Sequence, residues 1–245
     1  MEKEITLEVK NLTKKYGKKI AVNNISFKLN GGDIFGFIGP NGAGKTTTIK
    51  CIGGLLEYEG GDILINEKSN KGFDQNLKRS LGYVPDTPFL YDKLTGREFL
   101  YFVGRLYGMD KKKIEERIEE YSKKLEFSDY IDIRTEEYSH GMKQRIIIAS
   151  SFLHSPDIFL VDEPMVGLDP KSSKIVKDLF KEFSFSNRIL FISTHTLSLA
   201  EEICNKIGIM DKGNLVYFGS IDNLKESLKK SNLEELFLEI TKNDN

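Results

Sequence analysis

A glycine-rich segment with a lysine and two threonines occupies residues 39–47 and reads GPNGAGKTT. It fits the pattern G-x-x-x-x-G-K-[ST], in which backbone N–H groups wrap around phosphates. Gly42 and Gly44 allow the main chain to curl that closely. Lys45 is expected to reach the β and γ phosphates, and the Thr46 hydroxyl to bind Mg²⁺. The segment predicts a triphosphate site contacted by Gly39, Asn41, Gly42, Ala43, Gly44, Lys45, Thr46 and Thr47.

Two adjacent carboxylates, Asp162 and Glu163, directly follow the apolar run at residues 158–161. Ligands gather at the carboxyl ends of strands in open α/β sheets, so both acids are expected near the phosphates. We expect Asp162 to belong to the Mg²⁺ shell and Glu163 to be the general base that polarises the attacking water. A strand end that simply meets solvent is the alternative interpretation.

The strands that would position these residues are indicated by four short apolar runs. Residues 34–38, 80–84, 158–161 and 189–193 are rich in Ile, Val and Phe, as is typical of strands covered on both faces. They predict a buried, mostly parallel sheet. The first run leads into the glycine-rich segment, and a helical pattern follows that segment.

An antiparallel hairpin is predicted near the start of the chain. Residues 5–10, 25–29 and 33–38 alternate or run apolar, and Asn-Gly-Gly at 30–32 separates the last two runs. Glycines in such a turn tolerate positive φ, so we expect the strands at 25–29 and 33–38 to pair with each other.

Residues 89–157 have the pattern of an inserted helical subdomain. Thr95 and Glu98 predict a capping box, and apolar residues then recur at helical spacing among charged ones. The tail from residue 221 is also predicted to be helical and polar, with Ser231 and Glu234 as a second capping pair.

Size and composition indicate one compact α/β unit of 245 residues. The 36 Lys and Arg nearly balance the 37 Asp and Glu, so the formal charge of −1 gives no footprint for nucleic acid. The longest apolar stretch, residues 146–152, is far shorter than the ~20 residues needed to cross a bilayer. Cys51 and Cys204 lack metal-ligand spacing and are expected to be reduced thiols.

With these motifs the chain resembles the ATP-binding subunit family of ABC transporters from about residue 5 to residue 219. The segment YSHGMKQR at 138–145 looks like the family's signature sequence, with Tyr138, His140 and Met142 where Leu, Gly and Gln are usual. In that family two subunits pair head to tail, and each ATP lies between one phosphate loop and the other signature. The resemblance implies that Ser139 and Gly141 contact the partner's ATP.

Three further segments match the family in order. Residues 167–170 resemble the loop that crosses between subunits, His195 resembles the switch histidine, and Tyr16 matches the aromatic that stacks on adenine. His195 is expected to contact the γ phosphate. Asp86 stands where the family commonly carries a Gln that contacts Mg²⁺, and we expect it to act on the metal through water or to shift with nucleotide state.

The resemblance implies a P-loop NTPase core with a mostly parallel sheet, an N-terminal antiparallel β subdomain and an inserted helical subdomain. Within one domain of residues 1–245, the core would comprise 1–88 and 158–220, the helical subdomain 89–157 and the tail 221–245.

The implied function is ATP hydrolysis with Mg²⁺, coupled to transport and resembling that of bacterial export-type subunits. The partners would be a second copy or a homologous ATPase subunit and an integral membrane permease, with no nucleic acid, at the cytoplasmic face of the membrane. The alternative is a soluble ABC ATPase that acts on ribosomes or DNA. Such proteins usually carry two ATPase cassettes or a long coiled-coil insertion, for which this chain has no room.

Overall fold

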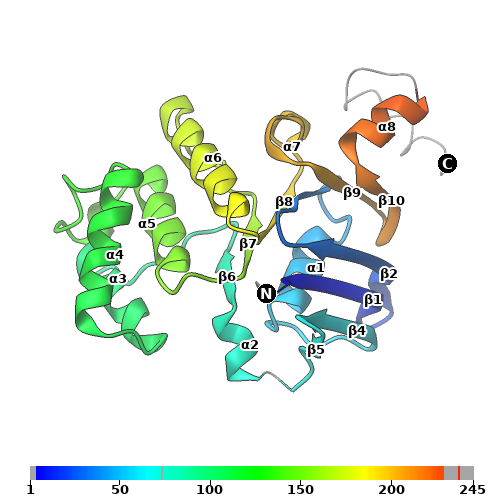
Figure 1. Cartoon of the computed structure of the whole chain (residues 1–245), viewed down its shortest axis with the longest axis horizontal. Coiled ribbons are helices and arrows are strands. Elements are labelled where there is room, and N and C mark those ends of the chain that lie inside the picture. Colours follow the sequence, from blue (N-terminus) through cyan, green and yellow to red (C-terminus); the bar gives the residue numbers. More distant parts are fainter. Residues whose placement is uncertain (1–3, 73, 229–236, 238–245) are drawn as a thin grey trace.

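The computed structural model describes residues 4–72, 74–228 and 237, which form two β-sheets and the helices around them (Figure 1). The predicted α/β class with a mostly parallel sheet and an N-terminal antiparallel sheet is confirmed. The strands are β1 (Thr6–Tyr16), β2 (Lys19–Asn30), β3 (Ile34–Ile38), β4 (Gly60–Ile65), β5 (Lys68–Ser69), β6 (Leu81–Val84), β7 (Ile158–Asp162), β8 (Ile189–Thr194), β9 (Lys206–Asp211) and β10 (Asn214–Ser220). The helices are α1 (Lys45–Ile52), α2 (Gln75–Arg79), α3 (Gly96–Leu106), α4 (Lys111–Lys124), the 3₁₀ turn η1 (Thr135–Glu137), α5 (His140–Phe152), α6 (Pro170–Phe185), α7 (Leu197–Ile203) and α8 (Ile221–Leu228).

The larger sheet has the strand order β10-β9-β3-β8-β7-β6. All neighbouring pairs are parallel except the β9–β10 pair at one edge. Every position of β3, β7 and β8 is buried, as their unbroken apolar sequences predict. Because these strands are parallel, the carboxyl ends of β3, β6, β7 and β8 all lie on the same side of the sheet. The segments expected to bind nucleotide follow these strand ends and are thus brought together.

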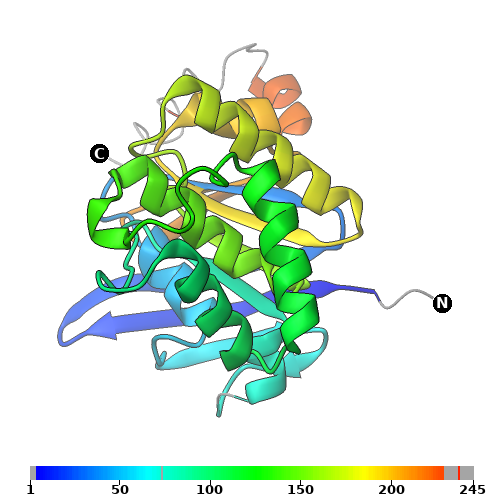
Figure 2. The same cartoon turned by 90° about the vertical axis from the view of Figure 1, so that its left-hand side faces the viewer.

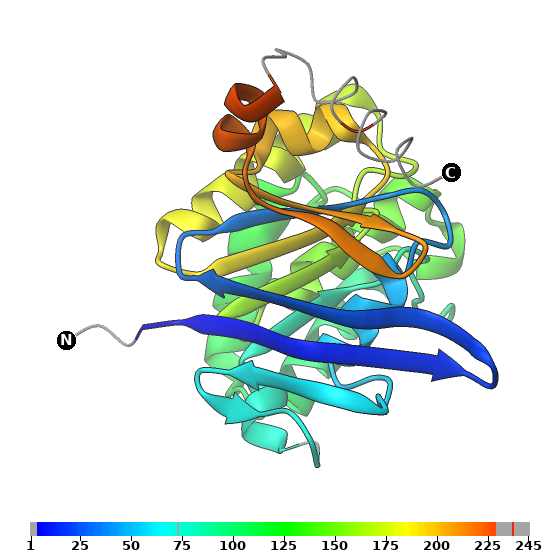
Figure 3. The same cartoon turned by 90° about the vertical axis from the view of Figure 1, so that its right-hand side faces the viewer.

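The predicted hairpin between 25–29 and 33–38 is wrong. The second strand, β2, pairs antiparallel with β1 in a separate sheet of order β2-β1-β4-β5, whereas β3 enters the parallel sheet (Figure 3). Much of β2 alternates between buried and exposed positions, while β3 is buried throughout and needs cover on both faces. The turn at residues 30–32 therefore carries the chain from one sheet to the other.

The helices α3, α4 and α5 lie together at one end of the molecule, which faces the viewer in Figure 2. The predicted capping box at the start of α3 is confirmed. The Thr95 hydroxyl accepts a hydrogen bond from the Glu98 N–H at 3.1 Å, and the Glu98 carboxylate accepts one from the Thr95 N–H at 2.9 Å. Two N–H groups that the helix leaves unpaired are thus satisfied.

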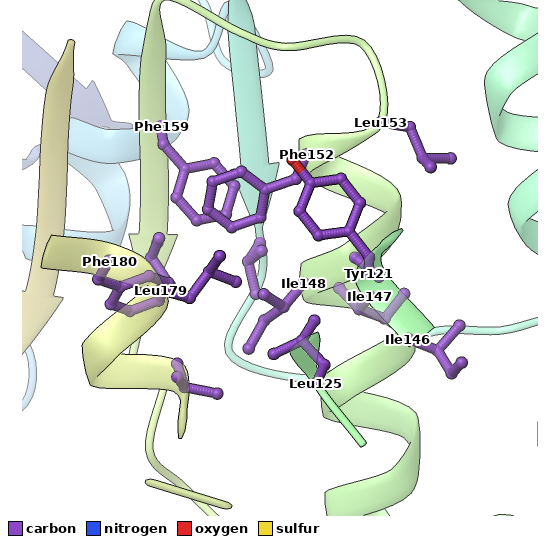
Figure 4. Close-up of a cluster of buried hydrophobic side chains, with 14 of the residues drawn as sticks. Tyr121, Leu125, Ile146, Ile147, Ile148, Phe152, Leu153, Phe159, Leu179 and Phe180 are labelled. Atoms are coloured by element: carbon purple, nitrogen blue, oxygen red, sulfur yellow. The ribbon is translucent and has the colours of Figure 1, made fainter. Parts of the chain in front are cut away.

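Hydrophobic clusters cover both faces of the parallel sheet. On one face, α1 packs with the antiparallel sheet in a cluster that contains Ile49 and Phe35. On the other face, α3 to α7 pack in a second cluster, part of which is drawn in Figure 4. There Phe152 of α5 lies against Phe159 of β7, with ring centroids 4.2 Å apart. Burial of each such ring stabilises the fold by about 2 kcal/mol and fixes α5 against the strand that ends at Asp162.

The last described helix, α8, begins at Ile221, where the helical tail was predicted to begin. The predicted capping pair Ser231 and Glu234 lies outside the described residues. Within residues 4–72 and 74–228, no helix has the length and apolar character needed to span a membrane.

Candidate active site

The phosphate loop joins β3 to α1 and depends on glycines at positions where another residue would be strained. Gly42 has φ +82° and Gly44 has φ +107°, both in the left-handed region that glycine tolerates. A Cβ atom on Gly44 would lie 2.4 Å from the carbonyl oxygen of Ala21. The same loop therefore needs glycine at position 44 both for its backbone angle and for its close contact with β2.

Lys45 is the first residue of α1, and its ammonium group lies inside the curl of the loop. Its Nζ donates hydrogen bonds to the carbonyl oxygens of Gly39 (2.7 Å) and Pro40 (3.1 Å). Burial lowers the pKa of Lys45, while the charges of Glu163 and Asp162 oppose that shift. The cation is thus bound by loop carbonyls and lies within electrostatic reach of Glu163, the predicted general base, and Asp162, the predicted Mg²⁺ ligand.

A cavity of about 300 Å³ lies at the loop and gathers residues from distant parts of the chain. Its lining brings together several of the predicted residues: Tyr16, Asn41, Gly42, Gly44, Lys45, Thr46, Thr47, Asp86 and Glu163. Lys19 and Ala21 also line it and were missed from the sequence. Lys19 lines the cavity because it pairs with Tyr16 across the β1–β2 turn. The only sequence signal for Lys19 was the lysine-rich segment around Tyr16.

Asp162 is the last residue of β7 and is fully buried. Within the described part of the chain, neither of its carboxylate oxygens has a hydrogen-bond partner within normal geometry. Burial raises the pKa of Asp162, and the nearby hydroxyls of Thr46 and Ser193 oppose the shift. A buried carboxylate with unused oxygens beside a threonine hydroxyl is a donor set that suits a hard cation such as Mg²⁺.

The wider surroundings of Asp162 also fit this metal. Among the residues that the structure describes, no group of three or more His, Cys, Asp or Glu side chains is placed to form a metal cage. Mg²⁺ usually binds through one or two carboxylates together with waters and substrate phosphates. Asp162 and Thr46 are oxygen donors of the kind that Mg²⁺ uses together with waters and phosphates.

Glu163 follows β7 and is fixed by the end of the neighbouring strand β8. Its Oε1 accepts hydrogen bonds from the His195 backbone N–H (3.0 Å) and from His195 Nδ1 (2.7 Å), and its Oε2 accepts one from the Thr194 hydroxyl (3.0 Å). With the Glu163 oxygen as the acceptor, the hydrogen of this contact lies on His195 Nδ1. The structure thus joins two predicted site residues, Glu163 and His195, in one hydrogen-bonded pair.

The backbone of Glu163 is in the left-handed region, with φ +50°. This conformation costs an ordinary residue about 1–2 kcal/mol, and such strain collects at functional sites. The bend turns the carboxylate away from the strand direction and into the cavity that Lys45 lines. The left-handed backbone thus accounts for how Glu163 leaves the strand and comes to line the cavity.

Ser139 and Gly141, the predicted contacts to a partner's ATP, lie elsewhere. Neither is among the described residues that line the cavity. Ser139 caps α5 and its hydroxyl accepts a hydrogen bond from the Met142 N–H at 3.3 Å. The ring of His140 lies against Gly167, where a Cβ would approach the ring to 2.2 Å. The start of α5 is thus packed on the segment that follows Glu163, a contact that the sequence did not indicate.

The phosphate loop, the buried Asp162 and Glu163 meet at the carboxyl ends of the parallel strands. Fold and site together therefore define a nucleotide-hydrolysing ATPase of the phosphate-loop class. Residues 22–166 match the family described as ABC transporter. The chain belongs to the ABC transporter family and is an ATPase of that family.

Two curated relatives and one solved structure illustrate how much of the chain is shared. The ABC-type transporter ATP-binding protein EcsA of Bacillus subtilis is 34% identical over 240 residues, covering 97% of each chain. The linearmycin resistance ATP-binding protein LnrL of the same organism is 34% identical and covers 89% of this chain and 70% of its own length. A solved ATP-binding subunit of an ABC transporter has a TM-score of 0.90 at 32% identity, covering 96% of this chain and 99% of its own.

Proposed function

We propose that this protein is the subunit that binds ATP with Mg²⁺ and hydrolyses it to drive export of a substrate through a separate membrane subunit. The observation that carries the proposal is the cavity that joins Lys45 and Thr46 to Glu163, beside the buried Asp162. The export direction is supported by a relative, the SkfA peptide export ATP-binding protein SkfE of Bacillus subtilis, which is 35% identical over 210 residues.

In this proposal each site residue has a distinct task. Asp162 and Thr46 would hold Mg²⁺, and the bound ion would supply positive charge next to the phosphates. Glu163 accepts the proton of the attacking water, and His195 fixes its carboxylate through the 2.7 Å contact. Tyr16 stacks on adenine at the outer end of the cavity, where half of its surface is exposed.

A second ATPase subunit would complete the site. Ser139 and Gly141 are not among the described residues that line the cavity. They lie at the exposed start of α5, where the first N–H groups of a helix have no intrahelical acceptor. In a head-to-tail pair these groups would contact the phosphates bound by the other subunit. His140 and Gly167 would then connect that surface with the hydrolytic site of the same subunit.

A membrane subunit is expected to dock on an exposed aromatic patch formed by Phe89, Tyr91 and Phe102. Their exposed fractions are 71%, 48% and 41%, and the Tyr91 ring lies 5.7 Å from each of the other two. Together with Leu94 these residues line a hollow between the end of β6 and α3. Exposed apolar patches of this kind mark interaction sites. We propose that residues 89–157 act as one helical subdomain that transmits movement from ATP to this patch.

Replacement of Phe102 by Ser should break the link to the membrane subunit. We expect a tagged wild-type protein to co-purify with an integral membrane protein from native membranes, and Phe102→Ser to lose it while hydrolysing ATP in solution. Phe185→Ser is the matched control, because Phe185 is 88% exposed at the far end of α6. Capture of ribosomes in place of a membrane protein would instead favour the soluble alternative.

Asp86→Gln tests the unusual residue in the loop after β6. Asp86 lines the cavity, and its charge adds to the effect of burial, which raises the pKa of the Asp162 carboxyl. If Asp86 acts on Mg²⁺ through water, loss of this charge-assisted contact should raise the half-saturating Mg²⁺ concentration about five-fold. The measurement is ATPase activity titrated with Mg²⁺, with Asp92→Asn as the control. An unchanged Mg²⁺ dependence and an unchanged turnover would remove this role.

A further inference from the structure

The aromatic ring of Tyr16 touches both the cavity and a lysine of its own strand. Tyr16 is the last residue of β1 and lines the cavity with Gly42 and Gly44. The Nζ of Lys14 lies 5.3 Å from the centroid of its ring. A cation at this distance from an aromatic face is attracted by the ring's electrons, and the contact restricts the ring's rotation.

Lys14 is in turn held by Glu59, which precedes β4. The Lys14 Nζ donates to Glu59 Oε1 at 2.8 Å, and the backbone N–H of Lys15 donates to Glu59 Oε2 at 2.7 Å. The Glu59 N–H donates to the carbonyl oxygen of Thr13 at 3.0 Å. Both carboxylate oxygens are therefore used to fasten the two residues that precede Tyr16.

Charge and burial reinforce this contact. Only 12% of the Lys14 side chain is exposed, against 46% for Glu59. The hydrogen bond from Lys14 and that from the Lys15 backbone hold the pKa of Glu59 below its usual value, and the same contact raises the pKa of Lys14. Both groups therefore stay ionised over the physiological range.

We propose that Lys14 and Glu59 form a brace that positions the Tyr16 ring for stacking on the adenine of ATP. The inference rests on the proposed function, since it assumes that Tyr16 meets adenine. Neither Lys14 nor Glu59 is among the described residues that line the cavity, so both act through Tyr16 as positioning residues. Lys14 and Glu59 should therefore affect the binding of the adenine base and leave the binding of the phosphates unchanged.

The test compares ATP with inorganic tripolyphosphate, a probe that lacks the base, by calorimetric titration of the 245-residue chain without Mg²⁺. Lys14→Met keeps the aliphatic stem and removes the charge, and we expect it to weaken ATP binding about two- to five-fold. Tripolyphosphate binding should be unchanged. Glu59→Gln should also weaken ATP binding. Lys14→Arg should bind ATP like the wild-type protein, because a guanidinium keeps the contacts to the Tyr16 ring and to Glu59.

Two further comparisons separate this brace from simple charge effects. Lys15→Met removes an equal charge from the same strand end and should bind ATP like the wild-type protein. In the Tyr16→Ala background, Lys14→Met should cause no further loss of ATP affinity. An equal loss in that background, or an equal loss for tripolyphosphate, would overturn the brace.

The outcomes also separate the brace from the adenine contact itself. If Tyr16→Ala weakens ATP binding while Lys14→Met and Glu59→Gln bind like the wild-type protein, the stacking stands and the brace is wrong. If Tyr16→Ala leaves ATP affinity unchanged, the assumption of adenine stacking is wrong and the brace falls with it.

Discussion

Glu163→Gln is expected to slow ATP hydrolysis by roughly 10²- to 10⁴-fold. The amide keeps the size of the side chain but cannot accept the proton of the attacking water. ATP should still bind, because the phosphate loop and the buried Asp162 are untouched. Single-turnover hydrolysis measures the rate, and size-exclusion chromatography with ATP should show that the variant accumulates as a nucleotide-held dimer.

The matched control for this change is Glu67→Gln. Glu67 lies on the exposed turn between β4 and β5 and, like Glu163, has a left-handed backbone, with φ +66°. The Glu67→Gln variant should hydrolyse ATP at the wild-type rate, which would show that the loss of hydrolysis in Glu163→Gln is specific to the site. Normal turnover in Glu163→Gln would refute the general-base assignment. If Glu163→Gln is slow but stays monomeric with ATP, the general-base assignment stands, and the proposal that a second subunit completes the site is contradicted.

Lys45→Ala is expected to weaken ATP binding by about 10- to 100-fold, since it removes charge-assisted hydrogen bonds to the phosphates. Calorimetric titration with ATP measures the change. Lys50→Ala, at the other end of α1, is the control for loss of a lysine from the same helix. Without Lys45, the negative charges of Asp162 and Glu163 would be less neutralised and would repel any polyphosphate. Tripolyphosphate binding should therefore be weakened as strongly as ATP binding.

This last comparison distinguishes Lys45 from the brace. Loss of Lys45 should weaken ATP and tripolyphosphate alike, whereas loss of Lys14 should weaken ATP alone. Unaltered ATP affinity in Lys45→Ala would contradict its assignment to the phosphates.

Local sequence patterns determined much of this protein. The phosphate loop, the capping box at Thr95 and Glu98, and the buried strands that lead to Gly39 and Asp162 were all predicted in place. Each depends on residues that are neighbours in the sequence: glycine at a left-handed backbone position, a hydroxyl three residues from a carboxylate, or an unbroken apolar run. Such features hold in any fold that accommodates them.

Tertiary structure decided which of these elements meet. The same apolar pattern suited β3 either as a hairpin partner of β2 or as a strand of the parallel sheet, and only burial on both faces selected the sheet. Glu163 and His195 are 32 residues apart, and their hydrogen bond exists because β7 and β8 are neighbours. Likewise, Glu59 reaches Lys14 only because β1 pairs with β4. Such contacts depend on the free energy of packing the whole chain, which no local pattern contains.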